Sequence, residues 1–141
     1  MDKNRLPVDV RKTVKRALEE DLGDGDITAD LLPQRSRATA HVICRESAVL
    51  CGIAWFDTTF QQIDADVAIT WHASDGDIIA EKMQLCTLKG PSRAILSGER
   101  TALNFLQTLS ATATQARRFA DRVKGLPVQV RDFRGQHLYP G

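Results

Sequence analysis

Apolar residues recur along the chain at two spacings, one typical of helices and one typical of strands. Three segments have an apolar residue every three or four positions: 8–22, 53–63, and a long region that runs from Gly90-Pro91 to about Lys124. Other segments alternate between polar and apolar residues, as half-buried strands do: 37–46, 49–51, 67–71, 77–80 and 84–88. The pattern predicts an α+β fold in which a small, mostly antiparallel sheet packs on helices.

Breaker residues separate these segments. Asp75-Gly76-Asp77 is a strong turn signal, and the long helix is expected to break near 110–114. Lys82-Met83 is only a loose match to the modifiable lysine of lipoyl- and biotinyl-carrier hairpins. Four aspartates crowd into one short stretch without the spacing of a calcium-binding EF-hand, so turn and cap chemistry is the better interpretation: Asp21, Asp24, Asp26 and Asp30.

The segment 98–110 has an unusual polar face. Arg100, Asn104, Gln107 and Ala111 follow one another at helical steps, and the face they form is polar but almost uncharged. The rigid guanidinium fork of an arginine matches carboxylate or phosphate oxygens in pairs. The row therefore suits an anionic ligand or a polar interface, although Arg100 could instead pair with a nearby acid such as Glu99.

Composition excludes several classes of protein. The 141 residues carry a net charge of +1, are 43% hydrophobic and 26% charged, and contain no basic run with interleaved aromatics. We therefore expect one soluble domain that binds neither nucleic acid nor membrane, without a leader. Three cysteines lack metal-site spacing and favour the reducing cytoplasm, and three histidines are scattered, so no metal or other cofactor is expected within the chain.

Three sequence blocks together resemble one family. EDLGDGDIT (20–28), VLCG (49–52) and GERTALNFLQTLSATAT (98–114), the last preceded by LKGP (88–91), are similar in sequence and spacing to the amino-terminal domain of quinolinate phosphoribosyltransferase. That enzyme is also called nicotinate-nucleotide pyrophosphorylase (carboxylating). The resemblance runs from about Val8 to Asp132 and implies an α/β-hammerhead-like domain. It assigns residues 1–126 to this domain and residues 127–141 to a divergent stub where the family's α/β barrel would begin.

The stub departs from the family pattern. The family continues with D-T-R-K-T-x-P-G, whereas this chain has Asp132-Phe-Arg-Gly135 and reaches Pro140-Gly141 with a spacing that differs by two residues. A close match that diverges over its last residues leads us to expect a truncated or frameshifted partial chain that lacks the barrel.

The resemblance also implies a function. The family makes nicotinate mononucleotide, CO2 and pyrophosphate from quinolinate and phosphoribosyl pyrophosphate in NAD biosynthesis, with Mg²⁺ as cofactor of the full-length enzyme. Its members are homodimers in which this domain caps the partner's barrel. The implied substrate-binding residues are Arg100, which would reach a quinolinate carboxylate in the partner's site, and Arg134. No catalytic residue is assigned, Asn104 and Gln107 are expected to hold the helix against the partner, and the chain alone should be inactive.

Two other interpretations stay open. The chain could be a stand-alone binding or regulatory module that has lost catalysis and uses the same surface to hold a partner. It could also be a fragment of the family's paralogue associated with molybdenum transport.

Overall fold

The computed structural model describes residues 8–23, 27–124 and 126. Its elements are, in chain order, α1 (Val8–Leu22), α2 (Ile27–Asp30), β1 (Arg37–Ile43), β2 (Ala48–Val49), α3 (Ile53–Ile63), β3 (Ala68–Trp71), β4 (Ile78–Ile79), β5 (Gln84–Pro91) and α4 (Ser92–Val123). The expected helices 8–22 and 53–63 are confirmed at both ends. The structure also confirms the α+β class, since a small antiparallel sheet packs on helices.

The strands form two antiparallel sheets. The larger has three strands in the order β1-β5-β3, and the smaller pairs β2 with β4. In the register of the larger sheet Val42 lies opposite Cys86 and Trp71 lies opposite the same cysteine, so one face of all three strands carries apolar side chains. This face is packed into the core, whereas the polar residues that alternate with it are on the other face.

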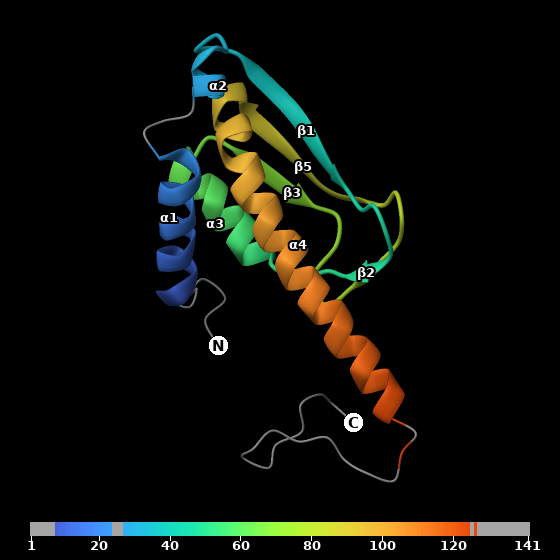
Figure 1. Cartoon of the computed structure of the whole chain (residues 1–141). Coiled ribbons are helices and arrows are strands. Elements are labelled where there is room, and N and C mark those ends of the chain that lie inside the picture. The colour runs from blue at the N-terminus through green and yellow to red at the C-terminus, as the bar shows by residue number, and fades with distance from the viewer. Residues whose placement is uncertain (1–7, 24–26, 125, 127–141) are drawn as a thin grey trace.

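The helices lie on the apolar side of the larger sheet. Figure 1 shows α4 crossing the sheet diagonally beside α3, with α1 on the outer side of the two helices. The main core fills the space between sheet and helices around Phe56, Phe60 and Leu106. A second, smaller core joins Val14 of α1 to Trp55 of α3 and its neighbours. The last turns of α4 project beyond the rest of the fold (Figure 1).

α3 and α4 approach closely at a glycine. Gly98 of α4 is buried, and a Cβ atom added there would lie 2.7 Å from Cε1 of Phe60 and 2.9 Å from Cδ1 of Ile63. Phe60 is itself almost fully buried, so its ring would have to shift against its core neighbours to make room for a methyl group. The contact explains why a helix-weakening residue stands in the second turn of α4.

α4 is continuous from Ser92 to Val123, so the expected break near 110–114 is wrong. The serine and threonine there bind neighbouring backbone instead. The Ser110 hydroxyl accepts a hydrogen bond from the Cys51 amide (3.0 Å) and donates one to the Cys51 carbonyl (3.1 Å). Oγ1 of Thr114 accepts from the Val49 amide (2.9 Å). These hydroxyls satisfy the edge of the segment that faces α4, whereas on its other edge Leu50 still bonds to the backbone of Asp77 and Gly76.

The start of α3 is capped from a distant turn. Oδ1 of Asp75 accepts hydrogen bonds from the amides of Gly52 (3.0 Å) and Ile53 (3.2 Å). Gly52 has a φ of 111°, a left-handed conformation that favours glycine. The expected Asp75-Gly76-Asp77 turn therefore exists and also satisfies two amides at the helix N-terminus.

β1 is shorter than expected. It ends at Ile43 because the register shifts between Val42 and Ile43. The next residue still bonds to the segment opposite: the Cys44 amide donates to the Met83 carbonyl, and the Cys44 carbonyl accepts from the Lys82 amide. Lys82 has a φ of 68° and serves this irregular pairing, so the Lys82-Met83 turn has a structural role.

We expect Gly98→Ala to lower the free energy of unfolding by about 1 kcal/mol, although alanine alone would favour the helix by about that amount. The added Cβ forces the Phe60 ring to shift, and overpacking a buried site costs roughly 1–3 kcal/mol. Urea unfolding followed by circular dichroism measures the change. Thr108→Ala, at an exposed position of α4, is the control and should stay within about 0.5 kcal/mol of the parent. A Gly98→Ala variant as stable as its parent would contradict the close packing.

We expect Ser110→Ala to destabilise the fold by about 1–3 kcal/mol, because it leaves the Cys51 amide and carbonyl without the hydroxyl that binds both. Thr112→Ala is a matched control, since its exposed hydroxyl bonds only to the Thr108 carbonyl of its own helix. The same urea experiment compares the two. Equal losses for the two variants would show that the contact with Cys51 contributes nothing.

Candidate functional site

Arg100, the residue singled out from the sequence, is exposed on the outer side of α4. The residues next to it in the chain, Thr101 and Ala102, are buried and so fix the orientation of the helix. Within the described part of the chain no hydrogen bond or ion pair engages the guanidinium. The salt bridge found there joins Arg117 Nε to Asp121 Oδ1 at 3.9 Å. The alternative in which Arg100 pairs with Glu99 is therefore wrong.

Asn104 and Gln107 lie along the same side of α4 as Arg100, and both are exposed. They border two different hollows: Gln107 lines the larger one, which faces the sheet, and Asn104 lines the smaller one, which faces α1. Arg100 lines neither. The row is thus a ridge between two hollows, with an arginine free to meet an external anion.

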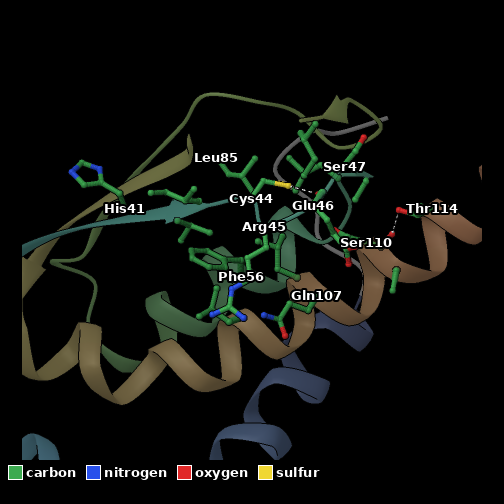
Figure 2. Close-up of a pocket in the computed structure, with 18 of the residues that line it drawn as sticks. His41, Cys44, Arg45, Glu46, Ser47, Phe56, Leu85, Gln107, Ser110 and Thr114 are labelled. Atoms are coloured by element: carbon green, nitrogen blue, oxygen red, sulfur yellow. Dashed lines mark hydrogen bonds between the residues drawn. The ribbon is translucent and has the colours of Figure 1, made fainter. Parts of the chain in front are cut away.

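The larger hollow is a cavity of about 790 Å³ between α4, β1 and the connection from β1 to β2 (Figure 2). Its floor is formed by core side chains that include Phe56, Leu85 and Leu106. The Ser110 and Thr114 hydroxyls on its α4 wall are already engaged with backbone. An apolar floor of this kind accepts apolar atoms and offers few free hydrogen-bonding groups.

Charged side chains surround the mouth of this cavity. Arg45 and Glu46 come from the β1–β2 connection, and Glu99 and Arg118 come from α4. Two bases and two acids balance, so the rim has no excess charge to attract an anion. Arg45 and Arg118 were not among the residues expected from sequence. Arg118 continues the helical steps from Gln107, which is a signal that could have found it, whereas nothing local marks Arg45.

The smaller hollow, about 450 Å³, lies where α1, α3 and α4 meet. Here the hydroxyl of Thr101 donates to the Asp21 carboxylate, so two of the family-like sequence blocks touch. Asp21 belongs to the last turn of α1 and links this helix to α4, a role beyond the expected turn chemistry. Asp24 and Asp26 of the same acidic stretch lie outside the described residues.

Two of the described cysteines, Cys51 and Cys86, are poor nucleophiles. Burial, and then the charge of Asp57, raises the pKa of Cys86 to about 12. Burial, followed by the charge of Asp75, also raises the pKa of Cys51. The thiolate is the reactive form, so neither residue supports thiol chemistry near neutral pH.

Among the described residues, Asp57 is the carboxyl group whose pKa its surroundings shift. Burial raises its pKa, while the hydrogen bond that it accepts from Trp71 Nε1 (2.8 Å) opposes that shift. Asp57 is held against the core by this bond.

Among residues 8–23, 27–124 and 126, no group of three or more His, Cys, Asp or Glu side chains is placed to hold a metal ion. No helix in this part of the chain is long and apolar enough to cross a membrane. Arg134, the second expected substrate-binding residue, lies with residues 127–141 outside the described part and stays a prediction.

Comparison with known proteins identifies the fold. Residues 26–110 match the model of a family described as quinolinate phosphoribosyl transferase, N-terminal domain. A chloroplastic nicotinate-nucleotide pyrophosphorylase (carboxylating) of Oryza sativa is 35% identical over 115 residues, which are 80% of this chain and 31% of the relative. A probable nicotinate-nucleotide pyrophosphorylase of Bacillus subtilis is 32% identical over 77% of this chain and 37% of the relative. The chain thus spans about a third of the length of these relatives.

Comparison with solved structures identifies the same family. The nicotinate-nucleotide pyrophosphorylase from Francisella tularensis matches with a TM-score of 0.80 and 36% identity, over 89% of this chain and 45% of that one. NadC from Streptococcus pyogenes matches with a TM-score of 0.84 and 28% identity, over 94% of this chain and 48% of that one. The chain belongs to the quinolinate phosphoribosyltransferase family, whose N-terminal domain it matches in sequence and in fold.

Proposed function

We propose that this chain acts as the substrate-capping domain of a quinolinate phosphoribosyltransferase in NAD biosynthesis. The observation that carries the proposal is Arg100: an exposed arginine without a partner among the described residues, on a helix whose opposite side is packed into the core, within the segment that matches the family. In the complete enzyme the products would be nicotinate mononucleotide, CO2 and pyrophosphate. The chloroplastic relative from Oryza sativa and the mitochondrial relative from Nicotiana tabacum are plant proteins, and for this chain we propose the cytoplasm.

The chemistry of Arg100 fits the substrate. Quinolinate carries two carboxylates on a small ring, and a guanidinium can bind one carboxylate through two parallel hydrogen bonds. Asn104 and Gln107 beside it add amide groups without adding charge, so the ridge keeps one positive centre. A ridge with one cation supplies only part of a site for a doubly charged anion. The remaining groups must come from another surface.

We place that other surface in a second subunit. Arg100 stands on a convex ridge and lines neither hollow, so it can reach into a site that faces it but cannot enclose a ligand by itself. A homodimer in which each domain caps the partner's barrel would use such a ridge. Asn104 and Gln107 would then contact the partner, and Arg134 would be a further carboxylate contact.

The pure 141-residue chain should show no turnover with quinolinate, phosphoribosyl pyrophosphate and Mg²⁺. Its described residues offer neither a cluster of metal ligands nor a second free cation on the Arg100 ridge. Release of CO2 from carboxyl-labelled quinolinate measures the reaction, with the Bacillus subtilis relative as the positive control. Turnover by the pure chain above background would refute the capping role.

Arg100→Ala should damage catalysis in a complete enzyme. We would build a chimera in which residues 8–124 of this chain replace the matching segment of the Bacillus subtilis relative. Losing a hydrogen-bonded charge pair costs about 1.5–3 kcal/mol, so kcat/KM for quinolinate should fall roughly ten- to hundred-fold. The KM for phosphoribosyl pyrophosphate should change little. Arg117→Ala, which removes another exposed arginine of α4, should leave both values unchanged.

A mixed dimer tests the proposed reach across subunits. Coexpressing the Arg100→Ala chimera with a chimera whose barrel is inactivated should restore activity, because one site then combines an intact barrel with an intact Arg100. A coexpressed pair that is no more active than the Arg100→Ala chimera alone would place Arg100 at its own subunit's site. Unchanged kinetics in Arg100→Ala would instead favour a stand-alone module without a substrate-binding role.

A further inference from the structure

Two histidines meet on the face of the larger sheet that points away from the helices. His41 of β1 lies opposite Thr87 of β5 in the register, and Thr70 of β3 lies opposite the same threonine. His72 follows two residues after Thr70, on the same face, and its amide donates to the Leu85 carbonyl of β5. The two rings thus flank β5 from both sides.

Both rings turn toward one atom. Nδ1 of His41 lies 3.3 Å from the Thr87 hydroxyl oxygen, and Nε2 of His72 lies 3.1 Å from it. The side-chain nitrogen of Gln84 lies 2.9 Å from that oxygen and 2.9 Å from His41 Nδ1. Four polar side chains from three parts of the sheet therefore converge on a single exposed point.

One proton arrangement leaves both imidazole nitrogens unprotonated. Gln84 Nε2 then donates one proton to the Thr87 oxygen and one to His41 Nδ1. The Thr87 hydroxyl donates its single proton to His72 Nε2, and no proton lies between His41 Nδ1 and the Thr87 oxygen. In this arrangement the lone pairs of both nitrogens are directed toward the centre of the cluster.

Neutral imidazole lone pairs that converge are ligands for divalent transition metals. We propose that this cluster is a surface site for a divalent transition-metal ion of the zinc, nickel or copper type, with His41 Nδ1 and His72 Nε2 as its ligands. An ion on His41 Nδ1 would displace the proton that Gln84 donates to this nitrogen. The amide would then turn by half a rotation to present its oxygen to the ion, and water would complete the coordination. A hard ion such as Mg²⁺ prefers oxygen ligands and does not fit.

The number of protein ligands and the nearby positive charge determine how tightly the site holds an ion. It has two protein nitrogens instead of the four ligands of a structural zinc centre, and Lys89 lies two residues along β5 on the same face. We therefore expect an exchangeable ion. A bound ion would tie β1 to the end of β3 across β5. This function is independent of Arg100, because the site occupies the face of the sheet opposite the helices.

Copper binding to the full 141-residue chain tests the proposal. His137 lies outside the described residues, so His137→Gln serves as the parent for all measurements. Calorimetric titration with Cu²⁺ should show saturable binding of one ion, and the electron paramagnetic resonance spectrum should show splitting from two nitrogen ligands. Zn²⁺ should compete for the site, and Mg²⁺ should not.

Single substitutions assign the ligands. His41→Gln and His72→Gln should each weaken Cu²⁺ binding at least tenfold and remove one nitrogen from the spectrum. Thr39→Ala, on the same exposed face of β1, should leave both readouts unchanged. Unfolding midpoints of the variants without metal show that the fold survives. A fall of less than threefold in either histidine variant, or the absence of saturable binding by the parent, would overturn the proposal.

Discussion

The close approach of α3 and α4 at Gly98 is the constraint on which the other features depend. Without a side chain at this position, the Phe60 ring sits directly against the α4 backbone and fills the core beneath the sheet. This contact determines which residues of α4 face inward. Because the buried seam includes Thr101 and Ala102, Arg100 must point outward, and the two hollows open on either side of its ridge. Packing inside the domain thus sets the chemistry of its surface.

Local pattern was enough to predict the helices and the polar ridge. The spacing of apolar residues in 8–22 and 53–63 located both helices to the residue, since each buries a continuous stripe. Arg100 was recognisable because an uncharged helical face with one arginine is unusual for a solvated surface. The family resemblance rested on short blocks, two of which meet in the structure where Thr101 binds Asp21.

Contacts between distant residues explain what local pattern missed. A break near Ser110 was expected, yet the hydroxyl there serves the Cys51 backbone, 59 positions away in the chain. The end of β1 depends on Lys82 and Met83, and the place of Arg45 at the cavity mouth depends on how the β1–β2 connection lies over α4. The approach of His41 and His72 to the same threonine, Thr87, requires the strand order β1-β5-β3, which periodicity alone does not reveal.

The cap on α3 links the folding of separate segments. Asp75 lies in the turn after β3, yet its carboxylate binds the first amides of a helix that begins 22 residues earlier. The first turn of α3 therefore gains these bonds only after the chain has passed through β3 and returned, a non-local closure that slows folding relative to a self-capped helix. The first turn of α3 and the turn at Asp75 should then open together as one cooperative unit, so amide exchange at Gly52 and Ile53 would report on a turn far along the chain.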